Sequence, residues 1–282
     1  NVVAPISTVI TNVGLDHVHI LGDTEEKIAF EKAGIIKMGI PCITAVDHLG
    51  ALNVIKRRAQ EVGSPLIRVS EGVEDPDESH IYWHNENNDF SIGTKMGMFH
   101  GLKCGLPGRY QIINAACATG AVAPFLKNHN ITEIDSFVRA GLASVHLPGR
   151  LETICNSPLV ILDGAHNGIA AQSLLPEIVK RKTGKLFLII GMSEGHDPDE
   201  FLRVFAKSTD KVLCTEAKWH RRLPAQALYD NAKNIGMNAT IVSDPTDAVK
   251  NAMAEASPED IVLVTGSFYV IGDVDRAKLS TS

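Results

Sequence analysis

The second half of the chain alternates short, nearly apolar runs with helical stretches, and this alternation limits the fold more than any other feature. We expect strands at RLETIC, PLVILDG, KLFLIIG, KVLCTE, ATIVS and DIVLVTG. The first two strands form a hairpin, and helices then begin near Asn167, Asp197, Pro224 and Asp244. Near-continuous apolar strands are typical of a parallel sheet covered on both faces. The pattern predicts a doubly wound, Rossmann-like α/β domain.

The first half is also of the α/β class. Strands are expected at ISTVIT, PCITAV and PLIRVS, and helices at DTEEKIAFEKAG and ALNVIKRRAQEVG. In the first helix, Asp23 and Glu26 form an N-cap pattern and Gly34 marks the end. HIYWH and FSIGTKMGMFHGLK flank an Asn-rich turn and predict an antiparallel hairpin. A long helix at LPGRYQIINAACATGAVAPFLKNH, expected to be buried, and a shorter one at ITEIDSFVRAGLASV complete this half.

A domain boundary is expected where Pro148 and Gly149 interrupt the helical pattern, which divides the chain into residues 1–147 and 148–282. With 282 residues, of which 44% are hydrophobic, the chain can form two cores. The boundary therefore predicts two domains of ordinary size.

Composition excludes several classes of function. The formal net charge is -6 and no basic stripe is present, which argues against a nucleic-acid partner. The apolar runs are far shorter than the roughly 20 residues that cross a bilayer. Five separated cysteines, with no CxxC pair, predict neither a zinc site nor a disulfide framework. The cytosol is the expected compartment.

Four strands end in polar or glycine-rich corners, and ligands bind at such ends in open α/β sheets. These corners are GLDHVH, DGAHN, GMSEGHD and TGSFY. In the first, Asp16 and His17 could supply a metal ligand or an acid/base pair, although such residues also cap helices. Lys32, among apolar neighbours on the next helix, is either a solvated residue or a partly buried, reactive amine.

The second half holds further candidates. Asp163 could accept hydrogen bonds from a ribose, while Asn167 either joins a site with His166 or merely caps the next helix. Arg150, isolated at the domain junction, could form paired hydrogen bonds with a phosphate or a carboxylate, or be an ordinary surface arginine. Ser267 offers a hydroxyl, although turns use serine simply as a turn former.

Familiar phosphate and zinc motifs are missing from the sequence. It contains neither GxxxxGKS/T nor GxGxxG, so no motif for the β- and γ-phosphates of a nucleotide is present. His196 and Asp197 approach a metal-binding pair. Without HExxH or a second well-spaced histidine, however, a zinc hydrolase is a poor interpretation.

Six motifs in order resemble the folylpolyglutamate synthase and dihydrofolate synthase family, relatives of the Mur cell-wall ligases. They are TNVGLDHVHILGDTEEKIAFEKAGIIK, GRYQIINAA, LPGRLE, LDGAHN, GMSEGHD and VTGSFY. The resemblance covers essentially the whole chain. It implies that residues 1–147 are the C-terminal part of a Mur-ligase-type central ATPase domain, and residues 148–282 a Rossmann-like C-terminal glutamate-ligase domain.

The resemblance implies an ATP-dependent C–N ligase. In this family the γ-phosphate of ATP is transferred to a carboxylate of a pterin-linked acceptor, and the amine of L-glutamate attacks the acyl phosphate. Cations stabilise the moving phosphate, and domain closure shields the acyl phosphate from water. The implied cofactors are ATP and Mg²⁺, with a monovalent cation as a further candidate.

Carried over residue by residue, the resemblance makes His17 a magnesium ligand. It makes Lys32 the lysine that reacts with CO₂ to form a carbamate, a carboxylate-like group that can coordinate or orient magnesium. These two residues would form the metal corner of the site.

The same resemblance implies contacts to nucleotide and amino acid. Asn114 would contact the adenine and Asp163 the ribose. Arg150 would reach the phosphates or the acyl phosphate from across a cleft between the domains. His166 and Ser267 resemble positions near the glutamate site.

Two departures from the family pattern matter. His196 stands where the family usually has lysine, so the charge there depends on pH. Family members also begin with a segment of roughly 140 residues that holds the Gly-rich loop, a metal-binding Glu and much of the acceptor surface. NVVAPISTVIT would follow that segment directly, so we expect this chain alone to be inactive and a P-loop segment to be its partner.

Two other functions stay open on the residues. One is a Mur-type amino-acid ligase with a different acceptor, and the other is a non-catalytic binding module that has lost its ATPase half. The sequence also leaves open whether the acceptor is dihydropteroate or a folate polyglutamate. We expect a monomer.

Overall fold

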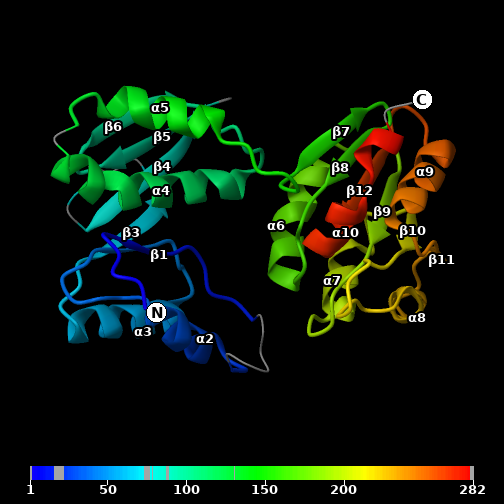
Figure 1. Ribbon diagram of the computed structural model, residues 1–282, viewed down its shortest axis with the longest axis horizontal. Coiled ribbons are helices and arrows are strands. Elements are labelled where there is room, and N and C mark those ends of the chain that lie inside the picture. The colour runs from blue at the N-terminus through cyan, green and yellow to red at the C-terminus, as the bar shows by residue number, and fades with distance from the viewer. Residues whose placement is uncertain are drawn as a thin grey trace. The chain divides into compact units, whose positions relative to one another are not determined.

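The computed structural model describes residues 2–15, 22–72, 77, 79–86, 89–129 and 131–279. It divides into two compact units, Asn1–His146 and Leu147–Ser282 (Figure 1). Each unit is built on a sheet of six strands. Within the described residues, no helix is both long enough and apolar enough to span a membrane.

The sheet of the first unit is mixed. Its strands lie in chain order: β1 (Thr8–Ile10), β2 (Cys42–Thr44), β3 (Leu66–Glu71), β4 (His80–Glu86), β5 (Asp89–Thr94) and β6 (Gly97–Leu102). The first four strands are parallel, and β4, β5 and β6 pair antiparallel. The predicted hairpin is therefore confirmed as β4 and β5.

Helices cover both faces of this sheet. Successive residues of β2 point to opposite faces, so Cys42 belongs to the core beneath α2 (Glu25–Ala33) and α3 (Leu49–Glu61). Ile43 belongs to the core shared with α4 (Arg109–Asn128) and α5 (Ile134–Ser144). The predicted helices are thus present on the two sides of one sheet.

Two local predictions for this unit are wrong. The N-cap of α2 is Thr24, whose side chain accepts from the Lys27 N–H, because Thr24 has extended backbone directly before the helix. Asp23 instead pairs with the Lys27 ammonium at 2.7 Å. Helix α4 buries only its sheet-facing side, and Val122 and Phe125 on it are 42% and 44% exposed.

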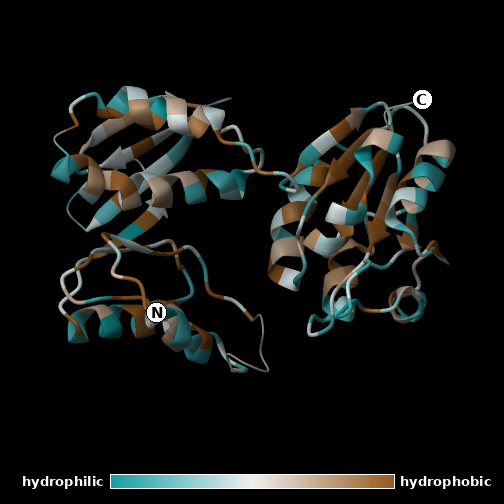
Figure 2. Ribbon diagram, viewed as in Figure 1, coloured by the Kyte–Doolittle hydropathy of each residue, from teal (hydrophilic) through white to brown (hydrophobic). Residues whose placement is uncertain are grey.

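The second unit is the predicted doubly wound sheet. Its strands are β7 (Glu152–Asn156), β8 (Leu159–Leu162), β9 (Leu186–Ile190), β10 (Lys211–Cys214), β11 (Ala239–Ile241) and β12 (Ile261–Thr265). They lie in the order β11-β10-β9-β12-β8-β7, with only β7 antiparallel to its neighbour. Every residue of β9 and β12 is buried, and Figure 2 shows hydrophobic residues concentrated on these strands.

The helices of this unit begin where the sequence predicts. They are α6 (Gly168–Val179), α7 (Pro198–Phe205), α8 (Ala225–Asn234) and α9 (Pro245–Glu255). Asp197 and Asp244 cap α7 and α9, each followed by proline at the first helical position. The short helix α10 (Phe268–Asp273), capped by Ser267, was not predicted from the sequence.

The strand order brings three of the polar corners together. Strands β8 and β9 flank β12 and all three are parallel, so their carboxyl ends meet at one edge of the sheet. The corners DGAHN, GMSEGHD and TGSFY follow these three strands. The fold therefore places them side by side.

Gly266 lies at this edge, where the backbone leaves no room for a side chain. Its φ is +101°, and a Cβ there would lie 2.6 Å from the Gly191 carbonyl oxygen. We expect Gly266→Ala to lower the free energy of unfolding by about 3 kcal/mol, because left-handed strain and backbone overlap add. Urea denaturation measures this loss.

Gly236→Ala is the matched control. Gly236 also has a positive φ, +86°, but nothing lies within 4 Å of the added Cβ. It should lose only about 1 kcal/mol, from backbone strain alone. Equal losses in the two variants would show that crowding at this edge has been overestimated.

Candidate functional site

Hydrogen bonds join the three corners of the second unit. The Gly266 N–H donates to the Ala165 carbonyl at 2.8 Å, and the Thr265 hydroxyl donates to the same carbonyl at 3.2 Å. The hydroxyls of Ser193 and Ser267 lie 3.3 Å apart. Hydrogen bonds between backbone and hydroxyl groups therefore connect the corners after β8, β9 and β12.

Two histidines from different corners meet at this edge. Their rings, in His166 and His196, have centroids 4.9 Å apart and are tilted by 57°. The His166 Nδ1 lies 2.9 Å from the Gly164 carbonyl oxygen, which can only accept, so Nδ1 carries a proton. Asp197, beside His196, caps α7 through the N–H groups of Asp199 and Glu200.

Arg150 lies in the turn that leads into β7. Its guanidinium lies 4.7 Å from the centre of the Phe268 ring, the first residue of α10. Among the residues that the structure describes, no carboxylate forms an ion pair with Arg150. A cation held over an aromatic ring and left without an acidic partner is suited to bind an anion.

Asp163 is 2% exposed, and both of its carboxylate oxygens accept backbone hydrogen bonds. Oδ2 accepts from the Leu151 N–H and Oδ1 from the Ala165 N–H, each at 2.9 Å. This geometry favours a structural task for Asp163, in which it ties the Arg150 turn to the DGAHN corner. Direct contact with a ribose, as the sequence suggested, is less favoured by such burial.

Asn167 and Ser267 both act as helix caps. The Asn167 Oδ1 accepts from the Ala170 N–H at 2.9 Å, so the capping interpretation holds for this residue. The Ser267 Oγ accepts from the Tyr269 N–H at 3.2 Å. Its hydroxyl hydrogen is still available to the Ser193 oxygen or to a ligand.

Sequence reasoning missed the aromatic residues at this edge. The Trp219 and Tyr269 rings stack with centroids 4.4 Å apart and planes within 6°. Phe268 and Tyr269 follow the TGS turn, and Trp219 belongs to the cluster KWHRR after β10. Aromatic residues in the segments that follow two strand ends were the available signal. Glu216 also follows β10. A hydrogen bond from the Ala225 N–H, and to a smaller extent one from Arg222, lowers the pKa of the Glu216 carboxyl below its usual range.

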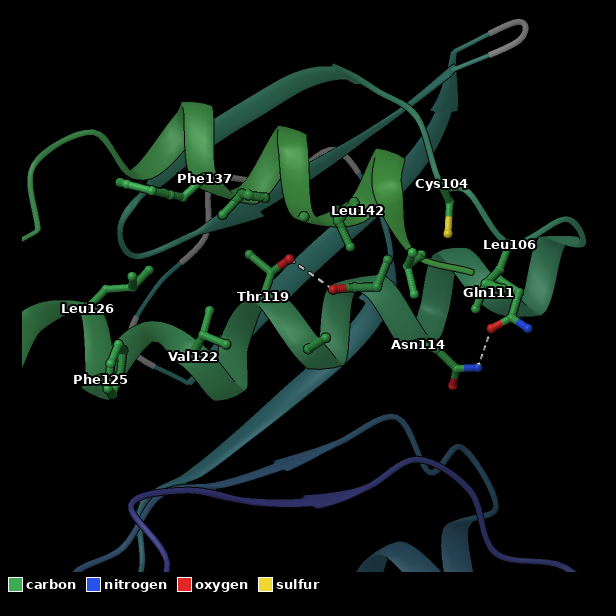
Figure 3. A pocket seen from close by; sticks show the side chains of 15 residues that line it. Cys104, Leu106, Gln111, Asn114, Thr119, Val122, Phe125, Leu126, Phe137 and Leu142 are labelled. Atoms are coloured by element: carbon green, nitrogen blue, oxygen red, sulfur yellow. Dashed lines mark hydrogen bonds between the residues drawn. The ribbon is translucent and has the colours of Figure 1, made fainter. Parts of the chain in front are cut away.

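The first unit has an apolar cavity of about 500 Å³ between α4 and α5 (Figure 3). Asn114 lies at one end, where its Nδ2 donates to the Gln111 Oε1 at 2.9 Å. The rest of the wall is mainly apolar and includes Val122, Phe125, Leu126, Phe137, Leu142 and Val145. A polar amide at the end of an apolar cavity can bind a flat heterocycle by its edge and its faces.

The predicted metal corner is only partly described. Asp16 and His17 lie outside the described residues. Lys32, half-buried on α2, donates from Nζ to the Asn12 carbonyl at 3.1 Å and so points back to the end of β1. No group of three or more potential ligands from His, Cys, Asp and Glu occurs in the described ranges.

Comparison with known families matches both units. Residues 1–122 match the Mur ligase middle domain, and residues 149–268 match the Mur ligase, glutamate ligase domain. The two matches together leave out only short stretches of the chain. They correspond to the two compact units of the structure.

A curated relative and two solved structures extend the comparison. The dihydrofolate synthase/folylpolyglutamate synthase of Bacillus subtilis is 34% identical, covering 98% of this chain and 63% of the relative. Escherichia coli FolC, in complex with DHPP and ADP, is 31% identical with a TM-score of 0.80, covering 93% of this chain and 59% of that one.

The second solved structure is a bifunctional folylpolyglutamate synthase/dihydrofolate synthase from Yersinia pestis, complexed with AMPPNP and Mn ion. It is 27% identical with a TM-score of 0.80, covering 97% of this chain and 62% of that one. This chain therefore spans about three fifths of the length of these three proteins.

The cavity gives a test of side-chain accessibility. Cys104 lines it and is half-buried, whereas burial raises the pKa of the Cys117 and Cys214 thiols to about 12. The thiolate is the nucleophile, so at pH 8 we expect iodoacetamide to modify Cys104 at least about tenfold faster than Cys117 or Cys214. Mass spectrometry of digested samples over time measures the rates.

The urea-unfolded chain is the control, in which all cysteines should react at similar rates. If Cys117 were modified as fast as Cys104 in the folded chain, α4 would not pack against the sheet as described.

Proposed function

Since this chain belongs to the Mur ligase family, on its folylpolyglutamate and dihydrofolate synthase branch, we propose that it acts in an ATP-dependent ligase. The ligase joins L-glutamate to a carboxylate of a folate or dihydropteroate acceptor. The observation that carries this proposal is Arg150, a cation without an ion-pair partner among the described residues. It lies in the same unit as the joined corners that contain His166 and Ser267.

The residues of the second unit suit acyl-phosphate chemistry. As the γ-phosphate moves to the acceptor carboxylate, negative charge develops on its oxygens, and the Arg150 guanidinium can stabilise that charge with paired hydrogen bonds. The Nδ1 of His166 donates to the Gly164 carbonyl, so a ligand would meet the ring through Nε2, as an acceptor or, when protonated, as a donor. We assign His166 and Ser267 to the glutamate carboxylates and amine.

Asn114 is proposed to contact the adenine. Its amide stands at the end of an apolar cavity, where a base could stack on aliphatic walls and bond by its edge. Asp163 would contribute through the Arg150 turn that it holds. Divalent metal, bound with ATP, supplies charge neutralisation to the transferring phosphate.

Lys32 fits the proposed carbamate, because a carbamate nitrogen keeps one N–H that can still donate to the Asn12 carbonyl. With His17 it would hold the magnesium ion. Three expectations stay predictions from the sequence: a monovalent cation as a further cofactor, a monomeric state and a cytosolic location. The assignment of residues 1–147 and 148–282 as the ATP-binding and glutamate-ligase domains is part of the same proposal.

A variant pair on α2 tests the role of Lys32. We expect Lys32→Ala to lower kcat by at least about 100-fold, because the metal corner would lose its anionic group. Lys27→Ala is the matched control on the same helix, since Lys27 is exposed and pairs with Asp23. Initial rates of glutamate-dependent ADP release, with this chain completed by a P-loop segment, measure the effect. Comparable losses in both variants would remove the case for a special lysine at position 32.

The ligase activity itself is tested by incorporation of labelled glutamate, with this chain completed by a P-loop segment, because the 282-residue chain alone is expected to be inactive. ATP, magnesium and either dihydropteroate or tetrahydrofolate are supplied, and Arg150→Ala is expected to lower kcat/KM for ATP about 100-fold to 1000-fold. Arg203→Ala is the control, because Arg203 forms an exposed pair with Asp199. Glutamate transfer to neither acceptor, but to a different carboxylate, would support another Mur-type ligase instead.

The 282-residue chain by itself is expected not to hydrolyse ATP at an appreciable rate. It contains no motif for the β- and γ-phosphates, so adenosine-side contacts alone would leave weak binding. An ADP-release assay with magnesium, acceptor and glutamate measures this. Robust turnover by the chain alone would contradict the expectation, and nucleotide binding without any ligase activity in the assay above would favour a binding module.

A further inference from the structure

The turn that presents Arg150 has an unfavourable backbone conformation. Gly149 has a φ of +72°, and Leu151 has a φ of +47°, the only positive φ outside glycine among the described residues. Leu151 is also buried, at 3% exposure. A branched side chain rarely adopts the left-handed region, so surrounding contacts must hold this conformation.

Three hydrogen bonds hold the turn Gly149–Leu151, and each has a different partner residue. The Leu151 N–H donates to the Asp163 carboxylate at 2.9 Å, and the Gly149 N–H donates to Glu152 Oε2 at 2.8 Å. The Gly149 carbonyl accepts from the Gly164 N–H at 2.8 Å. The backbone on both sides of Arg150 is thus bound to carboxylates, whereas the Arg150 side chain pairs with no carboxylate in the described part of the chain.

Glu152 is itself held by a residue near the C-terminus. Arg276, in the 3₁₀ turn Arg276–Lys278, donates from Nε and Nη2 to the two oxygens of Glu152 at 3.0 and 2.9 Å. The Glu152 side chain is only 15% exposed. A paired, two-point contact of this kind fixes the orientation of a carboxylate and neutralises its charge.

This neutralisation matters for Arg150. Glu152 is two residues away in sequence and is the acidic residue nearest to Arg150 along the chain. With its charge paired to Arg276 and one oxygen accepting from Gly149, it leaves Arg150 over the Phe268 ring.

Phe268 fits closely against the turn. A Cβ added at Gly164 would overlap the Phe268 ring, and one added at Gly149 would lie 3.2 Å from that ring. Both glycines therefore allow the ring to pack on the backbone that carries Arg150. The aromatic face then supports the guanidinium 4.7 Å above it.

We propose that Glu152 and Arg276, together with Asp163, are positioning residues that hold the turn Gly149–Leu151 and thereby direct the Arg150 guanidinium toward a phosphate group. The phosphate belongs to the nucleotide or to the acyl phosphate formed from it, so this inference rests on the proposed ligase function. A guanidinium already held in place loses little freedom when the phosphate binds, which favours the charged transition state.

Amide hydrogen exchange of the 282-residue chain tests the hold without any activity. In Arg276→Gln, exchange at the Gly149 and Leu151 amides should be at least about tenfold faster, because Glu152 loses its anchor and the turn opens more often. Arg276→Lys keeps the charge with a single donor group and should give an intermediate rate. Arg276 is 38% exposed, so these substitutions should leave the fold intact.

Lys211→Gln is the matched control. It removes the two-point pair between Lys211 and Glu255, at 2.7 Å to both oxygens, in the same unit but on β10 and α9. Exchange at Gly149 and Leu151 should then be unchanged. Unchanged exchange in Arg276→Gln, or equal acceleration in Lys211→Gln, overturns the proposed hold.

Kinetics in the ligase assay separate this inference from the proposed function. Arg276→Gln should lower kcat/KM for ATP by about tenfold to 100-fold, with partial recovery in Arg276→Lys and no effect of Lys211→Gln. If Arg150→Ala impairs the reaction and Arg276→Gln does not, the hold is unimportant and the inference is wrong. If Arg150→Ala itself has no effect, the phosphate role of Arg150 in the proposed function fails, whatever the exchange rates show.

Discussion

The candidate site of the second unit depends on one buried carboxylate, that of Asp163. It lies at the end of β8, in the interior, and accepts backbone hydrogen bonds from Leu151 and Ala165. A buried charge is costly unless hydrogen bonds compensate it, so the carboxylate and the two chain segments constrain one another. The turn before β7, which carries Arg150, and the corner before α6, which carries His166, are therefore fixed relative to one another.

The sheet order supplies the second constraint. Because β12 lies between β8 and β9, hydrogen bonds to Ala165 and Gly191 bring residues distant in sequence to a single edge. Glycines allow this close approach, as at Gly266, whose neighbours are backbone atoms. The polar groups at this edge include two imidazoles, two serine hydroxyls and one guanidinium. Such a set suits an anionic substrate that carries carboxylate or phosphate groups.

Much of the fold was predictable because the signals are local. The apolar runs of β9 and β12, and the Asp197 and Asp244 caps followed by proline, lie where pattern and capping chemistry put them. Where two neighbouring side chains can both cap a helix, the sequence does not show which one does. Thr24 rather than Asp23 caps α2, because the backbone geometry before the helix decides between them. For Asn167, likewise, the sequence allowed either a helix cap or a place in a site with His166, and it could not decide between them.

The sequence alone determined the doubly wound sheet, the four polar corners and the residue types of a site for phosphate and carboxylate groups. Periodicity and turn chemistry act over a few residues, so they can be read directly from the order of amino acids. Only the tertiary structure decided that Asp163 turns inward to the backbone, that Phe268 lies beneath Arg150, and that Arg276 holds Glu152 across 124 positions of sequence. These contacts depend on which strands are neighbours, and no local pattern encodes that relation.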